Sequence, residues 1–317
     1  MNEEEKCESK HLMIFPTQGE LEPSAEKGQK MHRAAVHSIK NIPPNQRIFL
    51  AECLEKKYVG GGVSSFTFRA EPDARNNESF SFRPGQWIDM FIPDVDVVGG
   101  FSMTSIPSQL PYFSLAIKDA DHPPTRWLTS ECQVGDFVTI RSGGDFFWTE
   151  ECSMPVPESS IDAKKEDRIL LVAGGIGINP LFSILLEVSH CLQSATPSKP
   201  GPKCAILYTA KDLDSLVFLD SINACVQEHP GMLHSCMKTT GNNGIDTATD
   251  QLGVGRLQVA DFEGAISFLK SDHNGESNAT GEKNIISYLC GPPSFCDGYE
   301  ELLHQLEIKD TRVERWW

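Results

Sequence analysis

The stretch from Ala173 to Pro180 constrains the fold of this chain more than any other, because it joins an apolar run to an apolar helix through three glycines. Residues 168–172 have the length of a strand, and residues 181–188 are apolar with a helical period. The glycines allow a tight turn and let a ligand approach bare backbone, and the unpaired first N–H groups of the helix suit an anion such as a pyrophosphate. A plain strand-to-helix turn remains the alternative, because Pro180 stands where the G-x-G-x-x-G fingerprint requires its last glycine.

A second unit of the same kind lies far downstream. Residues 285–290 form an apolar run that ends at Gly291-Pro292-Pro293, and residues 294–303 have a helical pattern. Turns that follow parallel strands share one rim of the sheet, where nucleotides bind. Strands are expected at 168–173, 204–209, 232–239 and 285–290, alternating with helices at 180–192, 215–227, 261–270 and 294–306. This alternation predicts a parallel sheet with helices on both faces.

The chain before residue 150 has a different pattern, with short apolar runs and frequent turns. Residues 63–70 alternate apolar and polar side chains, which is typical of a half-buried strand, and only one helical piece near 125–132 interrupts about six such runs. This pattern predicts a small antiparallel β barrel. We therefore expect a flexible N-terminal arm at residues 1–46, a barrel at 47–150, a linker at 151–167 and an α/β domain at 168–317.

Charge and cysteine content exclude several kinds of partner and site. The net charge of −16 disfavours binding to nucleic acid or to an anionic membrane surface, and no run is long enough for membrane insertion. The ten cysteines include no C-x-x-C pair, so no zinc or iron–sulfur site is expected. Cysteines within apolar segments suit a reducing compartment.

The two glycine-containing turns, G-G-x-G-I and then C-G-P-P, together resemble the NAD(P)-binding half of the ferredoxin–NADP reductase superfamily. In the barrel half, residues 83–86 match the P-G-Q that opens a flavin-domain strand in that family, although Pro and Gly also suit a type II turn. Residues 99–102 read Gly-Gly-Phe-Ser where the family has R-x-Y-S, so Gly99 replaces the arginine. That loss removes one charge-assisted contact to the flavin pyrophosphate, and an arginine restored at this position is expected to tighten flavin binding.

The resemblance implies a role for each matching residue. The Phe101 ring would pack on the flavin and the Ser102 hydroxyl would bond flavin N5. Cys290 would sit near the nicotinamide, with Glu314 within reach for proton transfer, although a buried small residue is an equally good interpretation of Cys290. The catalytic residues are therefore expected to be Ser102, Cys290 and Glu314. The expected cofactor-binding residues are Arg83, Pro84, Gly85, Gln86, Phe101, Ser102, Thr125, Gly174, Gly175, Ile176, Gly177, Ile178, Asn179, Gly291, Pro292, and Trp316 and Trp317, which would cover the flavin face.

These residues predict a flavin-dependent NAD(P)H oxidoreductase that passes hydride from nicotinamide to flavin and electrons to a separate, unidentified acceptor. FAD and NAD are the expected cofactors, and NADH is favoured because Lys211 beside Asp212 is a poor site for a 2′-phosphate. The alternative is a non-catalytic NAD-binding sensor or assembly module on the same fold, motivated by Gly99 and by Ile176, where relatives carry a hydroxyl residue. The resemblance implies a mitochondrial location, but the acidic N-terminus lacks the composition of a transit peptide, which leaves the cytoplasm as the other expectation.

Overall fold

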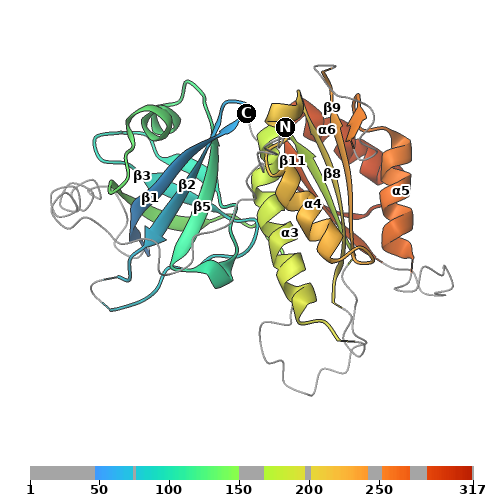
Figure 1. The fold of residues 1–317 in the computed structure, drawn as a ribbon, viewed down its shortest axis with the longest axis horizontal. Coiled ribbons are helices and arrows are strands. Elements are labelled where there is room, and N and C mark those ends of the chain that lie inside the picture. The colour runs from blue at the N-terminus through green and yellow to red at the C-terminus, as the bar shows by residue number, and fades with distance from the viewer. Residues whose placement is uncertain are drawn as a thin grey trace, which may run out of the picture.

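The computed structural model describes residues 47–73, 76–149, 168–196, 201–241, 252–271 and 284–315. These residues form a β-rich lobe and an α/β lobe that lie side by side (Figure 1). The expected arm at 1–46, the expected linker at 151–167 and the two tryptophans that end the chain lie outside the described residues.

The β-rich lobe is a six-stranded antiparallel sheet in the order β4-β3-β6-β1-β2-β5. A bridge between Met103 and Leu115 joins the two ends of this order, so the sheet curls into a barrel. Aromatic side chains fill its interior, and Phe68 stacks on Phe113 with ring centroids 5.5 Å apart. The elements are β1 (Phe49–Gly60), β2 (Val63–Ala70), β3 (Trp87–Phe91), β4 (Gly99–Ser102), η1 (Pro107–Gln109), β5 (Tyr112–Lys118), α2 (Pro123–Arg126), η2 (Trp127–Glu131) and β6 (Phe137–Gly143).

The α/β lobe is a six-stranded parallel sheet in the order β10-β9-β8-β7-β11-β12, with helices on both faces. The order of the strands reverses between β7 and β11, and such a switch point is where open α/β sheets bind nucleotides. The elements are β7 (Arg168–Gly174), η4 (Gly175–Gly177), α3 (Ile178–Gln193), β8 (Lys203–Ala210), η5 (Leu213–Ser215), α4 (Leu219–Glu228), β9 (Leu233–Thr239), β10 (Leu252–Val254), α5 (Val259–Lys270), β11 (Ile285–Gly291), α6 (Pro293–Gln305) and β12 (Asp310–Arg315).

The predicted fold class, a barrel followed by a parallel-sheet domain, is confirmed. The sequence pattern missed β10 and β12, because neither contains an apolar run. Helix α4 begins four residues later than expected, because Phe218 before it adopts a left-handed conformation with φ of 66°.

Helix α3 joins the two lobes. The Asn179 side chain donates a 2.7 Å hydrogen bond to the carbonyl of Ala116 in β5, and the Ser183 hydroxyl donates a 2.6 Å bond to the carbonyl of Ser105. Val63 and Ala116 of the barrel belong to the same buried cluster as the apolar face of α3. The junction is therefore a continuous core crossed by two hydrogen bonds, in which the Asn179 Nδ2 and the Ser183 hydroxyl have partners and the Asn179 Oδ1 has none among the described residues.

One stretch, Gly175–Gln193, is apolar and long enough to cross a membrane by length and composition alone, with a mean hydropathy of 1.3. Its most apolar part is 67% buried inside the protein. The sheet on one side and the barrel on the other account for that apolar character.

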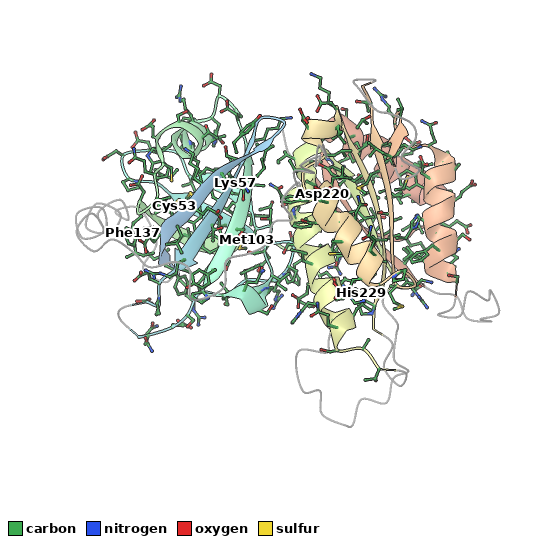
Figure 2. All side chains as sticks on the ribbon, in the orientation of Figure 1. Cys53, Lys57, Met103, Phe137, Asp220 and His229 are labelled. Atoms are coloured by element: carbon green, nitrogen blue, oxygen red, sulfur yellow. The ribbon has the colours of Figure 1, made fainter. Side chains whose placement is uncertain are left out.

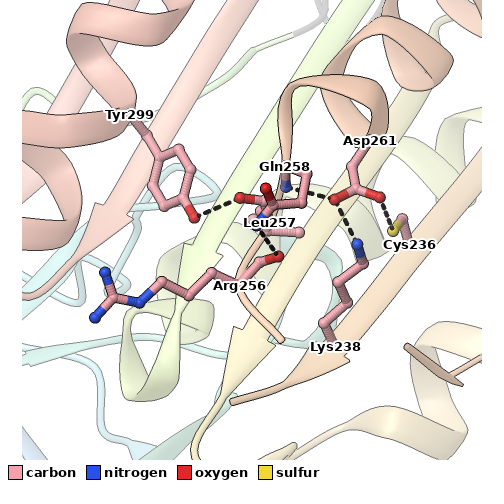
Figure 3. Close-up of polar contacts among 7 residues, drawn as sticks. All are labelled: Cys236, Lys238, Arg256, Leu257, Gln258, Asp261 and Tyr299. Carbon is pink, nitrogen blue, oxygen red and sulfur yellow. Dashed lines mark hydrogen bonds and ion pairs between the residues drawn. The ribbon is translucent and has the colours of Figure 1, made fainter. Parts of the chain in front are cut away.

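Helix α5 is fastened to the sheet through one carboxylate. Asp261 accepts a 2.6 Å bond from the Lys238 ammonium on β9 and another of 2.6 Å from the backbone N–H of Gln258, which precedes the helix (Figure 3). The thiol of Cys236 also lies 3.7 Å from this carboxylate. Burial by itself would raise the pKa of Asp261, but the bonds from Lys238 and Gln258 outweigh it and lower that pKa.

Replacing Asp261 with Asn should lower the free energy of unfolding at pH 7 by roughly 1.5–3 kcal/mol, the usual range for hydrogen bonds to a charged group. Because the folded pKa lies below the ordinary value of 3.8, this contribution is complete above pH 3.8 and is lost as the pH falls through the folded pKa. Denaturant unfolding of both proteins across this pH range measures the difference. The matched control is Asp297→Asn, which breaks an exposed pair with Arg315 and should cost under about 1 kcal/mol; equal losses in the two variants would contradict the assignment.

Candidate active site at the domain junction

The glycine turn after β7 combines an open position with a tightly packed one. Gly175 has φ of +54°, and a side chain built there would meet nothing within 4 Å. A Cβ at Gly177, in contrast, would lie 2.5 Å from the carbonyl oxygen of Cys290 in β11. The turn is therefore packed against β11 at Gly177 and open at Gly175, where a phosphate can approach the backbone.

The turn after β11 closes onto the same place. A Cβ at Gly291 would lie 3.2 Å from the Cα of Gly174, and at either glycine it would approach the Phe295 ring closer than 3.0 Å. Pro292 caps α6, whose first turn carries this ring. The two turns expected from the sequence thus meet at the switch point of the sheet, with Phe295 packed over both.

Thr209 is a site residue that the sequence did not reveal. It pairs with Gly174 across β7 and β8 and is only 6% exposed. Its hydroxyl has no hydrogen-bond partner among the described residues, and such a buried group is expected to have one. A hydroxyl at the carboxyl end of a parallel strand beside the glycine turn is the signal that sequence reasoning overlooked.

Cys290 and Glu314 lie opposite one another in the β11–β12 pair, so two of the three expected catalytic residues come together. Glu314 is half-buried, whereas Cys290 is fully buried against α3. The backbone of Cys290 supports Gly177, while its thiol faces the core. This placement fits the interpretation of Cys290 as a buried small residue.

The side chains of two of the expected cofactor residues belong to the core. The Ile178 side chain is completely buried in the cluster between the sheet and the barrel. The Asn179 amide is committed to Ala116 of the barrel. The prediction for both residues concerned the unpaired N–H groups of the first helical turn, which side-chain burial does not affect, so it stays a prediction. Ile176, which precedes them, packs half-exposed at the edge of the same cluster.

On the barrel side, Phe101 and Ser102 lie on β4, and Ser102 pairs with Trp87 of β3. Ser102 is 5% exposed, and its hydroxyl has no hydrogen-bond partner among the residues that the structure describes. The next residue, Met103, lies inside the barrel lobe (Figure 2). A buried hydroxyl with its bonding capacity unused fits a group that a bound ring would satisfy.

Gly99 cannot take an arginine as simply as the sequence suggests. A Cβ there would lie 2.4 Å from the Phe101 ring and 2.8 Å from Pro124. The expectation that an arginine would tighten flavin binding therefore needs correction, because the substitution would displace the aromatic ring that is expected to meet the flavin.

The turn of Arg83, Pro84, Gly85 and Gln86 lies at the junction. The Gln86 amide donates a 2.8 Å bond to the carbonyl of Gly144, and a Cβ at Gly85 would lie 2.8 Å from the carbonyl of Phe146 and 3.1 Å from Ile184. The turn therefore contacts residues 144–146, which follow the last barrel strand. Thr125 is buried in the short helix α2, and Trp316 and Trp317 lie outside the described residues.

Two further features set the limits of the site. Within the described ranges, no group of three His, Cys, Asp or Glu side chains could hold a metal ion. A cavity of about 270 Å³ between α3, α4 and η1 is lined from Phe182 to Gln193 along α3. It does not reach the glycine turn, so it is not part of the candidate site.

Comparison with known proteins agrees with this geometry. Residues 171–301 match the family model described as "Oxidoreductase NAD-binding domain". The chain is 35% identical over 244 residues to oxidoreductase NAD-binding domain-containing protein 1 of Danio rerio, an alignment that covers 75% of this chain and 82% of the fish protein. The chain belongs to the family of oxidoreductase NAD-binding domain-containing protein 1. Its human member is 32% identical over 253 residues, which cover 76% of this chain and 72% of that protein.

Solved structures show how widely this fold is shared. The FAD/NAD-binding domain of nitric oxide dioxygenase from Vibrio cholerae superposes with a TM-score of 0.60 at 18% identity, over 86% of this chain and 98% of that one. Ferredoxin–NADP⁺ reductase from Plasmodium falciparum superposes with a TM-score of 0.60 at 15% identity, over 87% of this chain and 99% of that one. The two-lobed fold is therefore shared with an FAD/NAD-binding domain and with a ferredoxin–NADP⁺ reductase.

Replacing Gly175 with Val should weaken NADH binding by at least tenfold, since a branched side chain at positive φ is strained and would occupy the open approach to the turn. Titration of the purified variant with NADH or NAD⁺ measures the effect. The matched control is Gly62→Val in the β1–β2 hairpin, which also has positive φ and open space around it. Unchanged affinity in the Gly175 variant would refute this location of the nucleotide.

Proposed function

We propose that this protein is a flavin-dependent NADH oxidoreductase that delivers electrons to a separate acceptor. The observation that carries the proposal is the buried hydroxyl of Ser102, which has no hydrogen-bond partner among the described residues. Ser102 pairs with Trp87, the residue that directly follows the turn at 83–86. The nucleotide side contributes a glycine turn with an open backbone position. The names of the structural neighbours, an FAD/NAD-binding domain and the NAD⁺ form of a human b5-reductase-type protein, support the same pair of cofactors.

The residues of this chain bind and align the two groups. Bound FAD would supply a ring that accepts hydride and passes electrons on. Gly175 offers bare backbone to a pyrophosphate, and Ser102 offers a hydroxyl to the flavin ring. Glu314, which lies opposite Cys290 on the neighbouring strand, can hold a proton on its carboxylate. Positioning of this kind provides much of the rate gain when two reactants must meet face to face.

The loop after β8 favours NADH over NADPH. Asp212 accepts a 3.0 Å bond from the backbone N–H of Ser215. The side chain of Ser215 is the main cause of the lowered pKa of Asp212, and this backbone bond lowers it further. The carboxylate is therefore ionised at pH 7 and would repel a 2′-phosphate, whereas it can accept a bond from a ribose hydroxyl.

The sign of the effect of Ser102→Ala on stability should depend on flavin. Without flavin, removing an unsatisfied buried hydroxyl should leave the free energy of unfolding unchanged or raise it. With FAD bound, the same change should weaken FAD binding about threefold to tenfold, because a hydrogen bond is worth about 0.5–1.5 kcal/mol. Thermal unfolding with and without FAD measures both, with Ser114→Ala, an equally buried barrel serine, as the control. A loss of stability in the flavin-free protein alone would contradict this role of Ser102.

The coenzyme and the end of the chain can be tested together. We expect higher kcat/KM with NADH than with NADPH, and we propose that Trp316 or Trp317 covers the flavin face. A chain ending at Arg315 should then show more nicotinamide charge-transfer absorbance and less discrimination between the two coenzymes. A preference for NADPH in the full chain would overturn the coenzyme proposal, and unchanged absorbance and selectivity would remove the tryptophans from the site.

A non-catalytic NAD-binding sensor or assembly module is the second candidate. It is favoured by Gly99, where Phe101 and Pro124 leave no room for the arginine that would hold a flavin pyrophosphate. A purified protein that is colourless and cannot take up FAD or FMN, yet binds NADH, would establish this alternative.

The separate electron acceptor and the mitochondrial location implied by the resemblance are also proposals. Imaging of the chain with its native start would test the location.

A further inference from the structure

Phe147 is the residue at which three parts of the chain meet. Its carbonyl oxygen accepts a 2.9 Å hydrogen bond from the Tyr288 hydroxyl of β11 and a 2.8 Å bond from the Arg312 guanidinium of β12. Arg312 also donates a 2.9 Å bond to the Tyr288 oxygen, so the two side chains support one another. The carbonyl of Phe147, in the segment that follows the last barrel strand, is thus bound by side chains from two strands of the nucleotide domain.

The barrel holds the same segment from the other side. The Arg83 guanidinium lies 4.4 Å from the centre of the Phe147 ring, which is a favourable cation–π distance. The backbone N–H of Trp148 donates a 3.1 Å bond to the carbonyl of Pro84. The Phe146 ring packs edge-on against Tyr288 with centroids 5.4 Å apart. Residues 144–148 are therefore held between the turn at 83–86 and the strand pair β11–β12.

The register of the strands connects this contact to the proposed reaction centre. Tyr288 lies opposite Arg312, and two residues further along the same strands Cys290 lies opposite Glu314. Residues two apart on a strand share one face and are separated by about 7 Å. On the barrel side, the turn at 83–86 leads directly into Trp87, which pairs with Ser102. Both halves of the proposed centre are therefore within a few residues of the carbonyl of Phe147.

We propose that Tyr288 and Arg312 are positioning residues that lock residues 144–148 to the nucleotide domain and so fix the separation of the nicotinamide and flavin rings. This inference rests on the proposed function. Neither side chain needs to touch a cofactor. Their effect follows from geometry, because a displacement of about 1 Å between reacting groups can cost on the order of a hundredfold in rate.

Three variants test the lock: Tyr288→Phe, which keeps the ring but removes the hydroxyl, Arg312→Met, which removes the charge and the donors, and Arg312→Lys, which keeps a charged donor. The matched control is Tyr299→Phe, because the Tyr299 hydroxyl also donates to a backbone carbonyl, that of Leu257 at 3.0 Å, but within the nucleotide domain (Figure 3). The measurements are amide hydrogen exchange of residues 144–148, the NAD⁺ dissociation constant, and the rate of flavin reduction by saturating NADH in stopped flow.

Tyr288→Phe and Arg312→Met should speed exchange in residues 144–148 and slow flavin reduction about tenfold or more, while the NAD⁺ dissociation constant stays within about twofold. Arg312→Lys should restore part of the rate, and Tyr299→Phe should change neither rate nor exchange. Faster exchange with an unchanged reduction rate, unchanged exchange, or equal effects in the Tyr299 control would each overturn the positioning role. If the wild-type protein takes up no flavin, the proposed function fails, and the exchange measurement alone then decides whether the two side chains lock the segment.

Discussion

The close approach of two backbone turns is the constraint on which the site depends. Gly177 packs directly on the carbonyl of Cys290, and Gly174 faces Gly291 beneath the Phe295 ring. A side chain at Gly177 would collide with the backbone of β11, and one at Gly174 or Gly291 would collide with the Phe295 ring; overpacking of this kind typically costs about 1–3 kcal/mol. Because β7 and β11 are neighbours where the strand order reverses, this contact also determines where a nucleotide can enter.

Helix α3 carries that constraint into the barrel. It begins at the glycine turn, covers one face of the sheet and contributes Asn179 and Ser183 to the junction. These two short hydrogen bonds fix the orientation of α3 against the barrel, which apolar packing alone would not do, because each polar group would be costly to bury without its partner. The second attachment is at Phe147, whose carbonyl accepts bonds from β11 and β12. The two lobes are thus held at two separate places, which suits a reaction that depends on the alignment of two rings.

On the barrel side of the site, Gly99 provides space for an aromatic ring at a position where the related motif has a charged side chain. Gly99 leaves room for the Phe101 ring, and that arrangement excludes the arginine found in the related motif. The buried hydroxyl of Ser102 and that of Thr209 across the junction both lack partners among the described residues. Unsatisfied hydroxyls of this kind are rare in protein interiors, and these two are the observations from which the proposal of a pair of cofactors starts.

The sequence by itself determined the barrel followed by a parallel-sheet domain, most of its strands and helices, and the two turns, because glycine-rich turns and apolar periodicity are local properties. It also singled out Ser102, Gly175 and Gly291 as candidate site residues; Gly175 has positive φ and Gly291 approaches Gly174 closely, while their roles stay predictions. Only the tertiary structure decided which neighbours are core, since Ile178 and Asn179 follow the same turn as Gly175 but point into the barrel contact. It alone revealed β12, Thr209, and the meeting of Tyr288 and Arg312 at Phe147, because these depend on strand register and on contacts between residues far apart in the chain. Such contacts leave no periodic signal in the sequence, because each partner is an ordinary residue until the fold brings the pair together.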